Sequence, residues 1–448
     1  MNLLERIKKN SLLRKTIALL AGLRFGFPGR HLTIIGITGT TGKTTTAFMV
    51  KNILEANGIK TGLISTAGFY IGEEIIYPES YALGTTPDLF FLYYLMKKIV
   101  KKSLKAPGTT PDPFFLHFLL RKMVKKGLKT VVIEVASFGL MFERVYGLNF
   151  SAAVLTNLSY NHHITMHGNM NNYVLAKLKL FRGLKPESIA VLPKESEYFD
   201  LFAKNTKAQV LSFGLDKTCD LWMEIKEITK TGNQVNIHCN DNSFSINLPL
   251  PGLFNIFNAL AAAGAVQKFS FSLENLKKGL ERLKNIPGRL EYINGKQSFS
   301  VIVDKANTPA AFCGIIDFIK ILNPRKKIAV YGNFGESPLK EREKLAEIAT
   351  SFFDLTIITE DDPQEESPQK SIDDFLNFVI RKNISSSKYL SFLSRRQAIQ
   401  EAIKQAGDKD LIVILGRGNE QTMDYGVRMK PFDDRQVTRE VLKEQGYL

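Results

Sequence analysis

The sequence predicts an α/β protein with largely parallel sheets. Short apolar runs typical of buried strands alternate with helical patterns along most of the chain. One of these runs leads through a turn rich in glycine and threonine into a helical stretch. The length of 448 residues exceeds what one core accommodates. We therefore expect a central P-loop NTPase-like domain with a parallel sheet over residues 32–287, followed by a C-terminal Rossmann-like α/β domain over residues 288–448.

The segment that precedes these domains, residues 1–31, mixes Leu, Lys and Arg at roughly helical spacing. A basic and apolar helix of this kind packs on the body of the protein or lies on a membrane surface, and packing is the favoured interpretation. Its most apolar stretch, residues 16–27, is short and contains Arg24, which makes it a poor candidate for a membrane span. No signal peptide is visible.

The glycine-rich turn reads GITGTTGKTTT over residues 36–46, between an apolar run at 32–37 and a helical pattern at 47–57. Glycines let successive backbone N–H groups converge on phosphate oxygens, and the helix directs its positive end toward them. Lys43 would reach the terminal phosphates and the Thr44 hydroxyl would hold Mg²⁺. The motif therefore predicts that the chain binds ATP or GTP.

The other elements follow from similar patterns. Residues 222–250 alternate around Gly232-Asn233 as antiparallel strands do, and an alanine-rich helix follows at 255–267. The Pro-Gly within residues 285–289 marks a hinge. The remaining predicted strands, each adjoining a helical pattern, are residues 130–135, 152–156, 300–303, 327–331, 355–359 and 410–415.

Composition bounds the class of protein. The net charge of +16 is compatible with nucleic acid, anionic membrane or phosphorylated partners, but no nucleic-acid-binding module is present and we expect no such partner. Much of the excess lies in residues 97–129, which are typical of a solvated lysine-rich helix face. The three cysteines, 219, 239 and 313, form no CxxC pair, so neither a disulfide framework nor a zinc ribbon is indicated and a cytoplasmic location is expected.

One internal repeat is present. Residues 84–92, GTTPDLFFL, recur as GTTPDPFFL at 108–116 with an offset of 24 residues. A single pair is not a solenoid, so we interpret it as a local tandem duplication of one loop and helix. The second copy leads directly into the strand at 130–135 and is therefore favoured for a role in a site.

Three further features carry potential chemistry. Glu134 ends a predicted strand, where open α/β folds place metal and ligand groups. Three of the six histidines lie within residues 161–167. This grouping is compatible with a role in a site and equally with a surface cluster. Lys177 lies on an apolar helix, where its side chain either reaches out to water or is desolvated, with a lowered pKa and a neutral amine.

Taken together, these motifs resemble the Mur ligases, the ATP-dependent amide ligases of peptidoglycan precursor synthesis, and most closely the type that adds the third residue to UDP-N-acetylmuramoyl-dipeptide. The resemblance spans about residues 32–440. It is carried, in family order, by GITGTTGKTTT (36–46), TTPD (85–88 or 109–112), EVAS (134–137), TNLS (156–159), YVLAK (173–177), PGLFNIFNALAA (251–262), IPGRLE (286–291), VDKANTP (303–309) and FDDRQV (432–437).

The resemblance implies roles for individual residues. The implied catalytic residues are Lys43, Glu134, His162, Lys177 and Asp304, and the implied metal ligands are Thr44, Glu134, His162 and Lys177. Lys177 would capture CO₂ as a carbamate, which turns a cation into an anionic ligand. The implied ATP contacts are Gly39, Thr40, Thr41, Gly42, Lys43, Thr44, Thr45, Asn255, Asn258, Arg289 and Asp304. The implied contacts with the muramoyl-peptide and the amino acid are Thr109, Thr110, Ser137, Asp362, Gln364 and Glu420.

The implied reaction uses ATP and Mg²⁺. A carboxylate of the muramoyl-peptide attacks the γ-phosphate to give an acyl phosphate, and the amine of an amino acid then displaces phosphate. The expected partners are the muramoyl-peptide and the amino acid, with peripheral membrane contact through residues 1–30, and the expected state is a monomer. The alternatives are a Mur-like nucleotide-binding scaffold without ligase activity and a ligase for a non-muramyl carboxylate, such as a folate polyglutamate. Thr44 argues against the folate branch, which usually has Gly-Lys-Gly here.

Several positions depart from the family pattern. About 35 residues precede the phosphate loop, where family members usually carry a domain that binds the uridine nucleotide, so the UDP part of the acceptor is in doubt. Asn161 stands where Asp or Glu usually precedes the histidine, and His163 is an alternative to His162 beside the metal. Gln364 replaces the Arg of diaminopimelate-adding members, and a glutamine cannot pair bidentately with a carboxylate. Lysine or another amino acid is therefore the better expectation.

Overall fold

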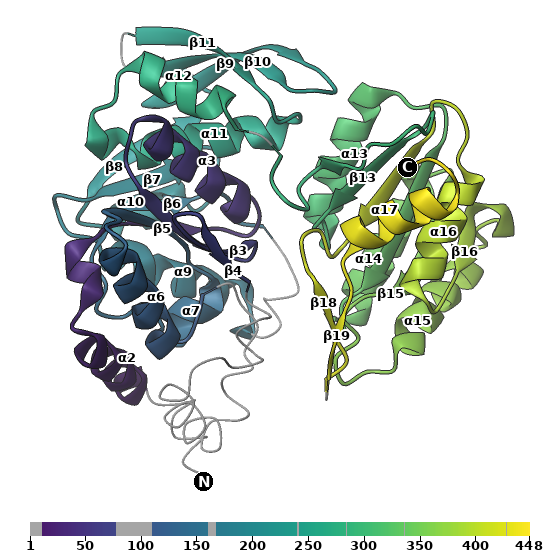
Figure 1. Ribbon diagram of the computed structural model, residues 1–448, viewed down its shortest axis with the longest axis horizontal. Helices are drawn as coiled ribbons and strands as arrows, with labels where there is room; N and C mark the ends of the chain where they lie inside the picture. The colour runs from purple at the N-terminus through teal and green to yellow at the C-terminus, as the bar shows by residue number, and fades with distance from the viewer. Residues whose placement is uncertain are drawn as a thin grey trace. The chain divides into compact units, whose positions relative to one another are not determined.

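The computed structural model describes residues 11–77, 110–159, 167–239, 242–283, 285–335, 337–426 and 428–448. These residues form two compact units, one that ends at Leu283 and one that follows it. Each unit is built on a mainly parallel β-sheet flanked by helices (Figure 1). The predicted α/β class is confirmed.

The first unit holds an eleven-stranded sheet in the order β11-β10-β9-β8-β7-β6-β1-β5-β2-β3-β4. The seven strands from β9 to β2 in this order run parallel to one another. The strands beyond them, β10 and β11 at one end and β3 and β4 at the other, pair antiparallel. Their bounds are β1 Thr33–Thr38, β2 Thr61–Ser65, β3 Gly68–Ile71, β4 Glu74–Ile76, β5 Thr130–Glu134, β6 Phe150–Leu155, β7 Ile189–Pro193, β8 Gln209–Gly214, β9 Leu221–Ile228, β10 Asn233–Cys239 and β11 Asn242–Leu248.

Helices cover this sheet and close its core. The central strands are buried on both faces, as expected where helices pack on each side of a parallel sheet. Apolar residues of β1, β5 and β6 share one core cluster with the buried face of α6. The helices are α2 Ser11–Phe25, the 3₁₀ turn η1 Pro28–His31, α3 Lys43–Ala56, α6 Pro113–Lys125, α7 Ser137–Met141, α9 Met170–Arg182, α10 Phe199–Lys204, α11 Leu253–Ala265 and α12 Leu273–Glu281.

The second unit holds a six-stranded sheet in the order β12-β13-β17-β14-β15-β16, parallel except for β12. The carboxyl ends of its parallel strands therefore meet at one edge. The strands are β12 Glu291–Tyr292, β13 Ser300–Asp304, β14 Lys327–Asn333, β15 Leu355–Glu360, β16 Tyr389–Ser391 and β17 Leu411–Leu415, with a separate hairpin of β18 Thr422–Asp424 and β19 Met429–Pro431. The helices are α13 Pro309–Leu322, α14 Leu339–Phe352, α15 Pro368–Arg381, α16 Arg395–Gln405 and α17 Asp434–Glu444.

Most predicted elements are confirmed, with boundary shifts of a few residues. The strands predicted in the second unit correspond to β13, β14, β15 and β17, and the antiparallel strands around Gly232 are β9, β10 and β11. The helix expected from residue 47 begins at Lys43, because Gly42 serves as its N-cap. The strands that were not predicted are β2, β3, β4, β7 and β8 of the first unit and β12, β16, β18 and β19 of the second. No helix among the described residues is long and apolar enough to cross a membrane.

Candidate active site

The phosphate loop joins β1 to α3 and depends on two glycines in conformations that disfavour side chains. Gly39 has φ +153° and Gly42 has φ +78°. A Cβ at Gly39 would lie 1.9 Å from Thr156 Oγ1, and one at Gly42 would lie 2.3 Å from Asn258 Oδ1. A side chain at either position would be strained, whereas glycine leaves the loop backbone free to approach an anion closely.

The segment that follows β6 holds this loop in place. Asn157 Oδ1 accepts hydrogen bonds from the Thr41 backbone N–H at 3.0 Å and from Thr41 Oγ1 at 3.2 Å. Thr156 Oγ1 donates to the Thr41 carbonyl at 2.6 Å, and the Ser159 N–H donates to Thr40 Oγ1 at 3.0 Å. The loop conformation is therefore held by contacts from a segment more than a hundred residues away in sequence.

Lys43 and Thr44 lie at the start of α3, where the motif predicts nucleotide and metal contacts. Lys43 Nζ donates to the carbonyl oxygens of Gly39 and Thr40, both at 2.9 Å, so the amine stays over the loop. The Thr44 side chain is buried and its hydroxyl lies 3.1 Å from Thr66 Oγ1. An ammonium group and a hydroxyl at the N-terminus of a helix match the chemistry of Mg²⁺-nucleotide binding.

Glu134 places a carboxylate at the carboxyl end of β5, in register with Ile37 of the neighbouring strand β1. The side chain is fully buried. Thr110 braces this strand end, since its hydroxyl donates to the Glu134 carbonyl at 3.1 Å and accepts from the Ala136 N–H at 2.8 Å. A carboxylate beside the strand that leads into a phosphate loop supplies the oxygen ligands that a divalent cation prefers.

Lys177 points into the protein. Its side chain is 1 % exposed, so the alternative that it reaches out to water is wrong. Nζ donates to the Gly39 carbonyl at 2.8 Å and to Thr38 Oγ1 at 3.4 Å, and lies 4.6 Å from the centroid of the Tyr173 ring. Burial lowers the pKa of Lys177 to about 7. The structure therefore brings a partly neutral amine to the first glycine of the phosphate loop.

His167 is a residue that sequence reasoning did not select. It is buried, its Nε2 lies 3.1 Å from Ser137 Oγ, and its ring stacks on Phe138 with centroids 4.8 Å apart. Burial, with a smaller effect of the Lys177 charge, lowers the pKa of His167 to about 4. The predicted substrate residue Ser137 thus has a neutral imidazole as its partner. The predicted His162 and its alternative His163, as well as Thr109, lie outside the described residues.

Asn255 and Asn258 lie on α11, next to the phosphate loop. Asn258 Oδ1 accepts from Thr46 Oγ1 at 3.3 Å, and Asn258 Nδ2 donates to Asn255 Oδ1 at 3.2 Å. Both side chains are buried. The pair connects α11 to α3 within the first unit, which places two amide groups beside Gly42, where the resemblance expects nucleotide contacts.

In the second unit, Asp304 holds the segment after the predicted hinge. Its two carboxylate oxygens accept from the Leu290 N–H at 2.7 Å and the Ala306 N–H at 2.8 Å. Burial raises the pKa of Asp304, although the charge of Arg289 opposes this. Gly288 packs directly on the turn after β17, since a Cβ there would lie 2.1 Å from the Asn419 nitrogen. Asp304 and Arg289 are therefore brought together at the carboxyl end of β13.

The residues predicted to bind the amino acid meet at the carboxyl ends of β15 and β17. Arg417 is fully buried, and its Nη1 contacts Asp361 Oδ1 at 3.0 Å and Asp362 Oδ1 at 2.6 Å. Glu420 forms an ion pair with Lys305. Burial would raise the pKa of Glu420, but the charges of Lys305 and Arg417 outweigh it and the pKa lies below its usual range. Sequence reasoning selected Asp362 and Glu420 but missed Arg417, the cation between them.

Gln364 lies in the same loop in a left-handed conformation, with φ +55°. Its backbone N–H donates to the Asp424 carbonyl at 2.9 Å, and the Asp424 N–H donates to Asp362 Oδ1 at 2.9 Å. The loop 361–364 is therefore held against β18. These contacts use the backbone of Gln364 and the side chain of Asp362.

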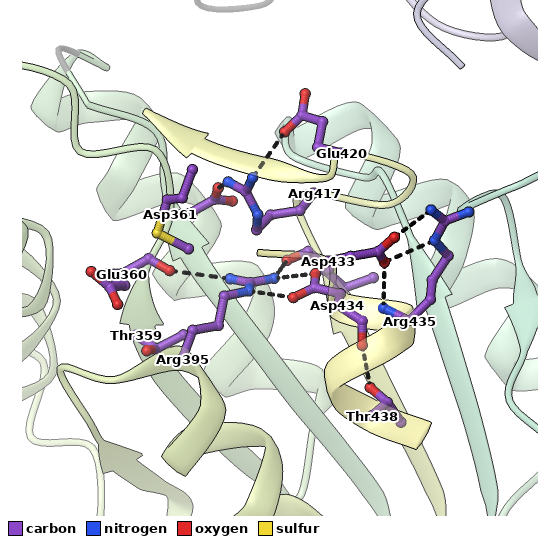
Figure 2. Close-up of polar contacts among 12 residues, drawn as sticks. Thr359, Glu360, Asp361, Arg395, Arg417, Glu420, Asp433, Asp434, Arg435 and Thr438 are labelled. Carbon is purple, nitrogen blue, oxygen red and sulfur yellow. Dashed lines mark hydrogen bonds and ion pairs between the residues drawn. The ribbon is translucent and has the colours of Figure 1, made fainter. Parts of the chain in front are cut away.

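A second buried arginine, Arg395, lies near Arg417 at this edge of the sheet (Figure 2). Arg395, at the start of α16, pairs bidentately with Asp434 at 2.7 and 2.8 Å and donates to the Leu415 carbonyl at 2.8 Å. Both side chains of the pair are fully buried. The pair fixes the N-terminus of α17 to the end of β17, the strand that leads into Arg417.

Comparison with known families agrees with this geometry. The model of the Mur ligase middle domain matches residues 37–266, and the model of the Mur ligase, glutamate ligase domain, matches residues 288–418. The chain belongs to the Mur ligase family. It is therefore an ATP-dependent ligase by family, and the expected class of enzyme is confirmed.

Among relatives, the chain is 32 % identical over 433 residues to UDP-N-acetylmuramoyl-L-alanyl-D-glutamate--2,6-diaminopimelate ligase of Clostridium botulinum, covering 96 % of this chain and 82 % of that protein. A solved structure of a ligase with this name aligns with a TM-score of 0.62 at 24 % identity, over 97 % of this chain and 84 % of that one. Mycobacterium tuberculosis folylpolyglutamate synthase aligns with a TM-score of 0.72 at 20 % identity, over 90 % and 92 %. The two solved structures show that the fold is shared.

Proposed function

We propose that this protein is an ATP-dependent amide ligase of peptidoglycan synthesis that adds an amino acid to a UDP-N-acetylmuramoyl-peptide-type precursor. The observation that carries the proposal is the position of Lys177, whose buried amine contacts the Gly39 carbonyl at the base of the phosphate loop. A nucleotide-binding scaffold has no need of a desolvated lysine there. The names of the relatives, which are muramoyl-peptide ligases, support the choice of acceptor.

The residues of the first unit fit the binding of ATP with Mg²⁺. Lys43 and the loop N–H groups would hold the phosphates, Thr44 and Glu134 would hold the metal, and bound Mg²⁺ would neutralise charge that develops on the transferred phosphoryl group. The Lys43 ammonium would have to leave the carbonyls of Gly39 and Thr40 to reach a terminal phosphate. Its present contacts keep it within the loop until a nucleotide offers a stronger acceptor.

We further propose that Lys177 is carbamylated. Its neutral amine would attack the carbon of CO₂, form an N–C bond and lose one proton, which converts the side chain into an anion suited to a divalent cation. The lowered pKa makes the neutral amine available near pH 7. We also propose that His162 is a metal ligand. In the second unit, we propose that Arg289 and Asp304 contact ATP.

The loop that carries Gln364 supports a choice of amino acid other than diaminopimelate. Asp362 and Glu420 are both occupied by cations of the protein, Arg417 and Lys305. Gln364 offers an amide, which cannot form the bidentate pair that an arginine makes with a distal carboxylate. We propose that lysine, or another amino acid without a distal carboxylate, is the second substrate.

The remaining elements of the proposal concern organisation and setting. We propose three parts, residues 1–31, 32–287 and 288–448, acting as a monomer in the cytoplasm. Peripheral membrane contact through residues 1–30 is part of this proposal.

The rival candidate is a ligase for a non-muramyl carboxylate, which the shared fold of folylpolyglutamate synthase favours. Phosphate release from Mg-ATP separates the two. With a pool of amino acids present, release should depend on UDP-N-acetylmuramoyl-dipeptide and not on a folate. Phosphate release that depends on the folate would replace the proposal with its rival. If neither acceptor stimulated phosphate release, both proposals would be refuted.

A further inference from the structure

The N-terminal helix α2 is fixed to the first unit by one face. Ala18, Ala21, Gly22 and Phe25 are buried, and the Phe25 ring meets Phe118 of α6 edge-on with centroids 6.3 Å apart. A Cβ at Gly22 would lie 2.6 Å from the Phe27 ring, which shows how closely the chain packs after the helix. This face explains why α2 is held on the body of the protein.

The opposite face of α2 is apolar and exposed. Leu19, Leu20 and Leu23 follow Leu12 by seven, eight and eleven residues, and these spacings place all four on one side of a helix. Their exposed fractions are 72 % for Leu12, 44 % for Leu19, 52 % for Leu20 and 67 % for Leu23. Thr16 is the exposed polar residue of this stripe, between Leu12 and the other three leucines. Because a solvated helix face normally carries charges, four exposed leucines on one side indicate an interaction surface.

Basic side chains flank these leucines. Residues 11–31 contain Arg14, Lys15, Arg24 and Arg30 and no Asp or Glu. Lys15, 5.1 Å from the centroid of the Tyr146 ring, and the exposed Arg24 lie on either side of the leucines. Arg14 lies on the inward side of the helix instead, where it donates to the Met141 carbonyl at 2.8 Å. An apolar stripe with cationic flanks is the pattern of helices that lie in the interface of an anionic bilayer.

The positive charge of the chain argues against two other partners for this face of α2, a second copy of the protein and a segment outside the described residues. A second copy of a chain with net charge +16 would bring like charge toward like charge. The parts of the chain outside the described residues carry the same sign: residues 1–10 hold three Lys or Arg and one Glu, and residues 78–109 hold five Lys against one Asp and one Glu. Anionic lipid is the partner that matches both the leucines and their basic flanks.

We propose that the face of α2 formed by Leu12, Leu19, Leu20 and Leu23 docks the protein peripherally on an anionic lipid bilayer. This deepens the membrane contact included in the proposed function and rests on that proposal for its role in the ligase. The helix would lie along the surface with its leucines among the acyl chains and its basic residues at the headgroups.

Flotation of the full chain with lipid vesicles tests this without any ligase assay. Vesicles of phosphatidylcholine with phosphatidylglycerol should bind the protein, and added salt should weaken the binding because headgroup attraction is screened. The double variant Leu19→Glu/Leu23→Glu should reduce binding by about tenfold or more. The matched control is Ile380→Glu/Leu393→Glu, which changes two residues of the second unit that are 67 % and 50 % exposed and should bind as the wild type does.

Each contrary outcome overturns the proposal. Equal binding to vesicles of phosphatidylcholine alone would show that the partner is not an anionic lipid. If the protein did not bind vesicles, or if the α2 variant bound them as the wild type does, the face of α2 would not be the docking surface. A wild-type dimer in light scattering that the α2 variant dissociates would assign the face to a second copy. Circular dichroism and ATP binding of the variant verify folding, and since flotation needs no turnover, failure of docking leaves the ligase proposal intact.

Discussion

Lys177 Nζ donates a 2.8 Å hydrogen bond to the carbonyl oxygen of Gly39, which joins the middle of α9 to the first residue after β1. The contact spans 138 residues of sequence and lies among fully buried groups. It gives the lysine two functions that can be tested separately. The amine positions the base of the phosphate loop, and under the proposal above it would become a carbamate that holds a metal ion.

Replacement of Lys177 by Ala should reduce amide formation by about 100-fold or more, the scale expected when a charged group beside a reacting phosphate is lost. ATP binding measured by calorimetry should change far less. Small carboxylic acids such as acetate should restore part of the activity by replacing the carbamate. The control is Lys179→Ala, which removes an exposed lysine of the same helix that pairs with Glu143. Equal loss in both variants would contradict the role of Lys177.

Gly42→Ala should weaken ATP binding by about tenfold, which corresponds to roughly 1.4 kcal/mol. The added Cβ would lie 2.3 Å from Asn258 Oδ1 in a backbone with φ +78°. Gly58→Ala is a close control, because φ there is +80° and nothing lies within 4 Å of the added Cβ. It imposes the same backbone strain without the clash. If both variants bind ATP equally, the close contact with α11 does not shape the loop.

Arg395→Ala should destabilise the protein by about 3–5 kcal/mol, because it leaves the fully buried Asp434 carboxylate without its bidentate partner. The neighbouring Arg396 forms exposed pairs with Glu440 and Glu444, so Arg396→Ala should cost less than about 1 kcal/mol. Urea unfolding of the two variants measures the difference. A small effect at Arg395 would show that the pair does not hold α17 to the sheet.

Gln364→Arg should increase the use of diaminopimelate relative to lysine, since a guanidinium can pair bidentately with the distal carboxylate. The measurement is the ratio of kcat/KM for the two amino acids. Gln369→Arg, on the exposed side of α15 where Gln369 contacts Asp373, adds the same charge away from the loop and should leave the ratio unchanged. An unchanged ratio in Gln364→Arg would remove this residue from the specificity pocket.

His117 should make the first unit sensitive to mild acid. Burial lowers its pKa from 6.5 to about 4, so between these values the unfolded chain binds a proton that the folded chain does not. The free energy of unfolding should therefore fall as pH decreases from 6.5 toward 4, by at most about 3 kcal/mol for this group. His117→Gln should flatten the slope in a urea titration against pH, whereas His31→Gln, at an exposed site, should not.

The phosphate loop could be predicted from sequence because a strand, a glycine-rich turn and a helix follow one another in the chain, although the contacts that hold the loop come from residues 156–159. The alternation of strands and helices likewise predicted the α/β class and part of each sheet, including β1, β5 and β6 of the first and β13, β14, β15 and β17 of the second. The direction of Lys177 could not be decided in this way. Helical spacing assigns a residue to a face, but whether that face meets a core or water depends on the packing of α9 on β1.

The contacts of the second unit were beyond sequence reasoning for a similar reason. Arg417 contacts Asp361 across 56 residues of sequence, and this contact requires a strand order of β17-β14-β15 that differs from the chain order.

In the first unit, His167 was considered only within a cluster of histidines, whereas its partner Ser137 lies 30 residues earlier in the chain. Such partners become visible only when the strand ends that carry them are placed side by side.

The most direct test of the account is mass spectrometry of the product. The protein would be incubated with Mg-ATP, UDP-N-acetylmuramoyl-dipeptide and a pool of amino acids, with Lys177→Ala in parallel. The account predicts that the acceptor gains the mass of one amino acid residue, that one phosphate is released for each product formed, and that the variant forms almost none. Binding of ATP without any gain in acceptor mass, or a gain that the variant reproduces in full, would contradict it.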